Sequence, residues 1–174
     1  EIYNHKNLEK ENNFTTKSSS DCEIILHMYK KYGITQTVKS LDGVFAFVLY
    51  DSHKQELYVS RDPIGVRSLY IGTCIEENTI CFSSEMKSIT NLCSKVELFP
   101  PGNILELSER VTIKMFPYNT CFESNWLSNY KIDTFEEVKK NIKELFTTAV
   151  NKRLMSDRPV GCLLSGGLDS SLVT

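Results

Sequence analysis

The strongest constraint on the fold is a series of short apolar segments, separated by turn residues, between residues 43 and 116. Residues 43–51 (GVFAFVLYD) are almost entirely apolar, aromatic or β-branched, which is typical of a strand buried on both faces. Residues 51–55 then predict a turn, and 56–61 predict a second strand that pairs back on the first. Strands joined by such short turns run antiparallel. The sequence therefore predicts an antiparallel sheet in this region.

The same pattern continues downstream. Further strands are predicted at 69–72 and 79–83, and a hairpin is predicted from 103–107 and 111–116. Between the strands, Asp62-Pro63-Ile64-Gly65 is typical of a tight turn, because Pro presets the backbone and Gly accepts a positive φ. Consecutive antiparallel strands with flanking helices indicate the α+β class.

One helix is predicted upstream of the strands. Apolar residues recur at helical spacing over 25–32, Gly33 supplies a stop, and Asp21 can cap the first turn. A shorter helical turn is predicted at 35–41. The polar residues 6–20 predict an exposed loop.

A second pattern begins after residue 133. Thr134 and Glu137 form a capping box, and apolar residues then repeat at steps of three and four along a predicted helix of about five turns. Pro159 ends any continuation. Residues 160–164 predict a short buried strand, which leads into SGGLDSS at 165–171 and a further helix. Helix, strand, glycine loop and helix are the opening of a parallel α/β domain.

A domain boundary is therefore expected near residues 120–130. Residues 117–133 are predicted to form a linker, in which Trp126 packs locally.

Composition excludes several functional classes. Lys and Arg total 20 and Asp and Glu total 22, so a net charge of −2 argues against phosphate-coated or anionic-membrane partners. The longest apolar stretch is far too short for a membrane span. None of the six cysteines forms a C-x-x-C pair, so we expect reduced thiols without a zinc site. Cys81 and Cys162 are predicted to be small core residues, and Cys22 to pack on a helix.

The glycine loop predicts an anion site. Adjacent glycines let backbone N–H groups approach an oxyanion, and serine hydroxyls can add hydrogen bonds. Asp169 beside a phosphate is explained if Mg²⁺ lies between them. No Lys follows the glycines, so the kinase or GTPase type of phosphate loop is excluded. The alternative is a Ser/Gly helix cap with no ligand.

Longer segments resemble a known family. VGCLLSGGLDSSLV at 160–173 resembles the pyrophosphate loop of the ATP pyrophosphatase superfamily, in the form found in glutamine-hydrolysing asparagine synthetases. EIYNH at 1–5, LDGVFAFVLYD at 41–51, RDPIGVRSLYIG at 61–72 and FSSEMKSI at 82–89 resemble segments of class II glutamine amidotransferase domains.

The resemblance implies a two-domain fold. Residues 1–120 would be part of an α+β N-terminal-nucleophile (αββα) sandwich, truncated at its N-terminus. Residues 121–133 would be the linker, and 134–174 the start of a parallel α/β synthetase domain of the adenine nucleotide hydrolase-like type.

The resemblance also implies roles for individual residues. In the family an N-terminal Cys attacks the glutamine carboxamide, and no residue of this chain matches it, so we expect the 174 residues alone to be inactive. Glu1 and Asp21 match residues that bind glutamine, Asp21 pairing with the α-ammonium. The residues that match the ATP site are Leu164, Ser165, Gly166, Gly167, Asp169 and Ser170, with Asp169 also matching a magnesium ligand.

The implied activity is ATP-dependent conversion of aspartate to asparagine, with ammonia from glutamine, through β-aspartyl-AMP and pyrophosphate release. ATP and Mg²⁺ are the implied cofactors. Glutamine, aspartate and ATP are the implied partners, with no nucleic acid or membrane, in the cytoplasm, and a homodimer is left open. Aspartate-binding residues are expected beyond Thr174.

Three alternatives remain open at the level of sequence. One is another class II amidotransferase, making phosphoribosylamine or glucosamine phosphate, although SGGLDSS counts against it. A second is a β-lactam-forming relative that lost glutaminase function. The third is a non-catalytic nucleotide-binding module.

Overall fold

The chain divides into two compact units, Glu1–Glu123 and Ser124–Thr174, in a computed structural model that describes residues 1–108, 112–119 and 134–174. Each unit is described by itself. The linker predicted at 121–133, with Trp126 and Cys121, lies outside the described residues. No helix among the described residues is long and apolar enough to cross a membrane.

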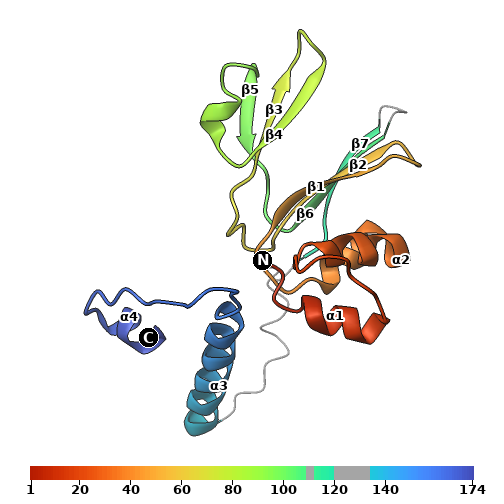
Figure 1. Ribbon diagram of the computed structural model, residues 1–174. Coiled ribbons are helices and arrows are strands. Elements are labelled where there is room, and N and C mark those ends of the chain that lie inside the picture. Colours follow the sequence, from red (N-terminus) through yellow and green to blue (C-terminus); the bar gives the residue numbers. More distant parts are fainter. Residues whose placement is uncertain (109–111, 120–133) are drawn as a thin grey trace. The chain divides into compact units, whose positions relative to one another are not determined.

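The first unit contains a four-stranded antiparallel sheet in the order β1-β2-β6-β7 (Figure 1). Its strands are β1 (Ala46–Asp51), β2 (Glu56–Arg61), β6 (Asn103–Ser108) and β7 (Thr112–Pro117). The β1–β2 and β6–β7 hairpins confirm the predicted pairings. The central β2–β6 pairing, Val59 opposite Leu105, joins segments more than forty residues apart.

A second antiparallel sheet follows in the order β4-β3-β5. Its strands are β3 (Tyr70–Cys74), β4 (Thr79–Ser83) and β5 (Lys95–Leu98). The predicted strands at 69–72 and 79–83 are confirmed. The sequence did not predict β5, because its four residues (KVEL) are half charged and it lies at a sheet edge, where charged side chains are common.

Apolar side chains of both sheets meet in one core cluster. Val59 and Leu105 from the first sheet pack with Leu69 and Phe99, and all four are at most 5% exposed. Ile71 from the second sheet packs against this cluster. The strands thus form a two-layer sandwich, and the predicted antiparallel α+β class is confirmed for this unit.

Helices cover the other face of the first sheet (Figure 1). α2 (Glu23–Ser40) supplies Ile24, Met28 and Val38 to a second core cluster, to which β1 and β6 contribute Leu49 and Ile104. Gly33, at φ 75° and ψ 172°, interrupts α2, so the predicted stop and the predicted short second helical segment are both confirmed.

Residues 6–12 were wrongly predicted to be loop. α1 (His5–Asn12) is a helix whose Leu8 is buried in the same cluster as α2. Its Lys and Glu residues are good helix formers, and one buried apolar side chain is enough to dock so short a helix. Asn13 ends α1 in the left-handed conformation, at φ 55°.

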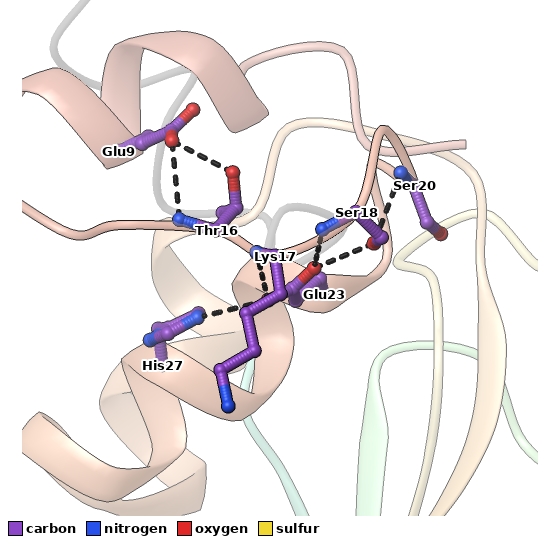
Figure 2. Close-up of polar contacts among 7 residues, drawn as sticks. All are labelled: Glu9, Thr16, Lys17, Ser18, Ser20, Glu23 and His27. Atoms are coloured by element: carbon purple, nitrogen blue, oxygen red, sulfur yellow. Dashed lines mark hydrogen bonds and ion pairs between the residues drawn. The ribbon is translucent and has the colours of Figure 1, made fainter.

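The segment between α1 and α2 is held by two carboxylates (Figure 2). Glu9 of α1 accepts hydrogen bonds from the Thr16 hydroxyl and backbone. Glu23 of α2 accepts from the backbone N–H groups of Lys17 and Ser18, each at 2.8 Å, and from the Ser18 hydroxyl. These hydrogen bonds lower the pKa of Glu23 from 4.5 to about 2.

Strand β1 differs from its prediction. Leu49 is buried toward the helices, but Val48 and Tyr50 on the opposite face are 47% and 57% exposed. Among the described strands, β1 is at a sheet edge. The prediction from its continuous apolar sequence, that both faces of this strand would be buried, was therefore wrong.

The second unit contains two helices. α3 (Phe135–Arg153) begins with the predicted capping box between Thr134 and Glu137, which is confirmed. α4 (Leu168–Val173) follows the glycine loop. No residue of α3 or α4 is buried.

The strand predicted at 160–164 is absent from the described residues. A strand needs a hydrogen-bonded neighbour, and these residues pair with none in the described part of the chain. Cys162 is exposed, so its prediction as a core residue was also wrong.

The buried position of Ile104 can be tested. Ile104 belongs to β6 and is fully buried against the helices. Ile104→Ala should therefore lower the free energy of unfolding by about 2–5 kcal/mol in urea titrations. Ile113 on the neighbouring strand is 59% exposed, and Ile113→Ala is the control, expected to change stability by about 0.5 kcal/mol or less. Equal losses for the two variants would contradict the described core.

The Glu23 carboxylate predicts a pH dependence. Because folding lowers the pKa of Glu23, its ionised carboxylate stabilises the folded chain. This contribution is fully present above pH 4.5, the ordinary pKa, and is lost as the pH falls toward about 2. Wild type should therefore be more stable than Glu23→Gln at neutral pH, and the difference should vanish between pH 4.5 and about 2. Urea midpoints at a series of pH values measure this. A difference that persists at the lowest pH would rule out the proposed ionisation.

Candidate functional site

A cleft of about 280 Å³ opens in the first unit where the start of β1 meets the N-terminus of α2. Its wall is apolar along Val44–Phe47. Polar groups converge on it from elsewhere in the unit: Glu1, Cys22, Arg67, Ser68 and Ser84. Such a combination of an apolar wall and a few convergent polar groups is typical of small-molecule sites.

The loop that carries Arg67 is built around the buried carboxylate of Asp62. Asp62 is 1% exposed. Its Oδ1 accepts hydrogen bonds from the backbone N–H groups of Ile64, Gly65 and Val66, at 3.2, 2.6 and 2.9 Å. Its Oδ2 accepts from the N–H of Arg67 at 3.0 Å. One carboxylate therefore fixes the whole turn that was predicted at 62–65 and extends it to Arg67.

The same carboxylate ties the loop to the cleft wall. Oδ2 of Asp62 also accepts from the Phe45 N–H at 3.3 Å, and the Asp62 N–H donates to the Phe45 carbonyl at 2.8 Å. Phe45 belongs to the apolar wall. The positions of the wall and of Arg67 are thus set by one side chain.

Arg61 holds the far end of the loop. Its guanidinium is 5% exposed and donates to three backbone carbonyls, those of Gly65, Arg67 and Phe99, at 2.7, 2.6 and 2.8 Å. A buried guanidinium satisfied by carbonyls does not need a carboxylate partner to be tolerated. Arg61 therefore positions the loop and does not itself line the cleft.

Opposite charges meet at the mouth of the cleft. The Arg67 guanidinium lies 3.8 Å from Oε1 of Glu1, and both side chains are about half exposed. The backbone of Glu1 pairs with Val44, which accepts from the Glu1 nitrogen at 2.8 Å and donates to the Glu1 carbonyl at 2.9 Å. Glu1 is thereby fixed beside the wall.

Asp21 lies behind this edge. Its Oδ2 accepts a hydrogen bond from the Ile2 backbone N–H at 2.6 Å. Burial is the largest influence on Asp21 and opposes its ionisation, but the Ile2 hydrogen bond, the Glu1 α-ammonium and the neighbouring Cys22 and His5 together outweigh it and lower the pKa of the carboxyl below 3.8. Asp21 stays ionised, as a site for an ammonium group requires.

Two predictions about this segment were wrong. Asp21 does not cap α2, because Cys22 is the N-cap residue and no side-chain cap hydrogen bond forms. Cys22 is exposed and lines the cleft, so it is not a packing residue. The structure brings Glu1 and Asp21 together through Ile2, and it adds Arg67, which the sequence reasoning missed. No local motif signals this role, because Arg67 meets Glu1 only in the folded chain.

The second group of predicted site residues lies in the glycine loop of the second unit. Ser165 and Ser170 are joined by a hydroxyl–hydroxyl hydrogen bond of 2.8 Å, and Ser170 also donates to the Gly167 carbonyl. Gly166 has a φ of 79°, which explains its residue type. Asp169 lies in the first turn of α4.

The remaining predicted residue of this group, Leu164, does not shield the glycine loop from solvent. Leu164 is 60% exposed. No group of three or more His, Cys, Asp or Glu side chains that could hold a metal was found in the described part of the chain. Asp169 offers a single carboxylate, which suits Mg²⁺ only where phosphate oxygens complete the coordination.

Family comparisons match both units. The model of the glutamine amidotransferase domain matches residues 1–123, about seven tenths of the chain. The chain belongs to the glutamine amidotransferase family. The model of asparagine synthase matches residues 141–174. The two matches confirm the resemblance expected from the sequence, in the expected order.

Curated relatives carry the same combination. The chain is 39% identical over 176 residues to a protein named probable asparagine synthetase [glutamine-hydrolyzing] from Schizosaccharomyces pombe. It is 41% identical over 194 residues to asparagine synthetase [glutamine-hydrolyzing] from Homo sapiens. Each alignment covers 99% of this chain but only 30% and 34% of the relative, so the chain spans about a third of their length.

Solved structures support the fold. An allosteric regulatory enzyme of purine biosynthesis superimposes with a TM-score of 0.60 at 22% identity, over 68% of this chain and 27% of that one. Glutamine phosphoribosylpyrophosphate amidotransferase from B. subtilis gives 0.58 at 24% identity, with the same coverage. These matches show that the chain has the fold of an amidotransferase with α-helices and β-sheets.

The Asp62 interaction predicts a specific loss of stability. Asp62→Asn keeps the shape but replaces one acceptor oxygen of a buried side chain by an NH₂ group, which leaves partly buried N–H groups of the loop without their acceptor. The free energy of unfolding should fall by about 1–3 kcal/mol in urea titrations. Glu76→Gln, at an exposed position in the β3–β4 turn, is the control and should change stability little. An Asp62→Asn chain as stable as the control would show that the carboxylate does not organise the loop.

Proposed function

We propose that the chain is part of a glutamine-hydrolysing asparagine synthetase. Residues 1–120 would belong to its glutamine amidotransferase domain, 121–133 to a linker, and 134–174 to the start of its synthetase domain. The observation that carries this proposal is the order of the two family matches, glutamine amidotransferase at 1–123 and asparagine synthase at 141–174.

The cleft of the first unit has the charges that glutamine requires. Free glutamine carries an ammonium and a carboxylate on the same carbon. Glu1 lines the cleft, and Asp21 lies next to it, with its Oδ2 3.9 Å from the Glu1 nitrogen; the two would supply carboxylates for the ammonium, and the lowered pKa of Asp21 keeps it ionised. Arg67 supplies a guanidinium beside them, 3.8 Å from Glu1, for a carboxylate. The apolar wall at Val44–Phe47 suits the methylene groups of the side chain.

Within this proposal, the described residues bind and orient glutamine but do not attack it. The family's nucleophile is an N-terminal Cys, and no cysteine in these residues matches it. Cys22 lines the cleft, but burial and the neighbouring Asp21 raise the pKa of its thiol, which makes it a poor nucleophile at neutral pH. That these 174 residues alone release no ammonia from glutamine stays a prediction.

The glycine loop would hold ATP. Ser165, Gly166, Gly167 and Ser170 would bind the pyrophosphate part, since hydroxyl and N–H donors meet there, and Leu164 would contact the nucleotide. Asp169 would bind Mg²⁺ between itself and the phosphates. Aspartate would then be activated as β-aspartyl-AMP, pyrophosphate released, and ammonia from the first domain would complete asparagine in the cytoplasm.

The alternatives are less well supported. A phosphoribosylamine- or glucosamine-phosphate-forming amidotransferase shares the fold of the first unit, but the asparagine synthase match at 141–174 is not explained by it. A nucleotide-binding module without catalysis does not explain the charged cleft around Glu1 and Arg67.

Two substitutions in the full-length enzyme separate the two half-reactions. Asp21→Asn should raise the KM for glutamine by about tenfold or more, because a substrate ammonium loses its ion pair, and should leave synthesis from added ammonia unchanged. Asp169→Ala should abolish aspartate-dependent pyrophosphate release and leave glutamine hydrolysis largely intact. Ammonia and pyrophosphate assays measure both.

Asp157→Ala is the matched control in the second unit, because Asp157 is exposed and outside the glycine loop. Its pyrophosphate release should equal that of wild type. Normal pyrophosphate release by Asp169→Ala would contradict the ATP site, and absence of any aspartate-dependent pyrophosphate release in wild type would contradict the proposed function.

A further inference from the structure

Three of the cysteines gather around one glycine of the second sheet. Gly72 of β3 is opposite Cys81 of β4 in the antiparallel register. Side chains of paired residues project from the same face of a sheet, and so do those of residues two apart on one strand. Cys81, Cys74 and the missing side chain of Gly72 therefore share a face. The neighbouring pair, Ile71 and Phe82, packs into the core on the opposite face.

Cys93 occupies the space that a side chain at position 72 would fill. A Cβ atom added to Gly72 would lie 2.5 Å from the Cys93 sulfur and 3.0 Å from its Cβ. A real side chain could not approach so closely, so Gly72 is what allows Cys93 to lie against the sheet. Cys93 is fixed there because its backbone N–H donates to the Ile89 carbonyl at 3.0 Å, and Ile89 is 5% exposed.

Cys93 lies against Gly72, and Cys81 is the residue opposite Gly72, so the two side chains are neighbours on this face. Burial raises the pKa of the Cys93 thiol, and the neighbouring Cys81 raises it further. The two thiols are not linked to each other in the structure. Both are partly exposed, so a small oxidant can reach them. Cys74 shares the face, but it is opposite Thr79 and thus only diagonal to Cys81.

We propose that Cys81 and Cys93 are a site of oxidative modification, at which peroxide converts the two thiols to a disulfide across the outer face of the second sheet. One sulfur attacks a peroxide oxygen, the O–O bond breaks and the sulfur becomes a sulfenic acid, while the departing hydroxide takes up the thiol proton and leaves as water. The second sulfur then attacks the sulfenic sulfur, and a second water leaves. Two thiols and one hydrogen peroxide give one disulfide and two water molecules.

The bond would close segment 82–92. That segment contains Ser84, which lines the cleft of the first unit, and the turn in which Ser83 and Ser88 bind the Glu85 carbonyl. The oxidation state of the pair would therefore add a covalent constraint to a part of the cleft wall that hydrogen bonds and the packing of Phe82 and Ile89 hold in the reduced form.

Peptide mapping tests the pairing. The reduced chain is treated with graded hydrogen peroxide, its remaining thiols are alkylated, and it is cut with trypsin and a Glu-specific protease. Lys87 separates Cys81 from Cys93, and Glu77 separates Cys74 from Cys81, so each disulfide joins a different pair of peptides. We expect the Cys81 and Cys93 peptides to be joined first and to separate on reduction. A linkage through Cys74, or sulfinic acids without any linkage, would overturn the proposal.

Variants and a stability measurement complete the test. Cys81→Ser and Cys93→Ser should each abolish the linkage, and the triple variant Cys22→Ser/Cys121→Ser/Cys162→Ser should retain it. Oxidation should raise the Tm by roughly 5 °C or more in that control and leave Cys93→Ser unchanged, because closing a short loop restricts the unfolded chain. A linked chain with an unchanged or lower Tm would show that the bond does not fit the fold, and would overturn the proposal.

Discussion

The buried carboxylate of Asp62 is the interaction on which the first unit most depends. It accepts hydrogen bonds from five backbone N–H groups, four of them in the loop 64–67 and one in Phe45. A buried carboxylate without these donors would have unsatisfied oxygen atoms, and the loop without the carboxylate would have unpaired N–H groups. Each therefore requires the other.

This interaction also connects the core to the site. The backbone carbonyl of Asp62 accepts from Gly102, at the turn before β6, and Arg61 reaches the carbonyl of Phe99, which belongs to the inter-sheet core. Arg67, at the end of the same loop, faces Glu1 at the mouth of the cleft. The charged groups proposed to bind glutamine are thus placed by rigid contacts and not by a free loop.

Much of the fold could be predicted from periodicity. β2, β4, the β6–β7 hairpin, the break at Gly33 and the capping box of α3 all depend on local patterns of a few residues. β5 and α1 could not be predicted this way, because one buried side chain in α1 and the pairing of β5 with β3 are decided by distant parts of the chain. The opposite error occurred at 160–164, where an apolar sequence has no strand to pair with among the described residues.

The site shows the same division. Glu1 and Asp21 could be named only through the family resemblance, since neither residue has a distinctive local pattern. Arg67 was missed because its role arises from a contact with Glu1, sixty-six positions away, that no short motif specifies. In the glycine loop the reverse holds: the Ser165–Ser170 and Ser170–Gly167 hydrogen bonds span five residues or fewer. Because these hydrogen bonds are local, the sequence SGGLDSS alone was enough to predict the class of ligand. The cleft of the amidotransferase unit is formed by residues far apart in the chain, so it could be recognised only in the folded structure.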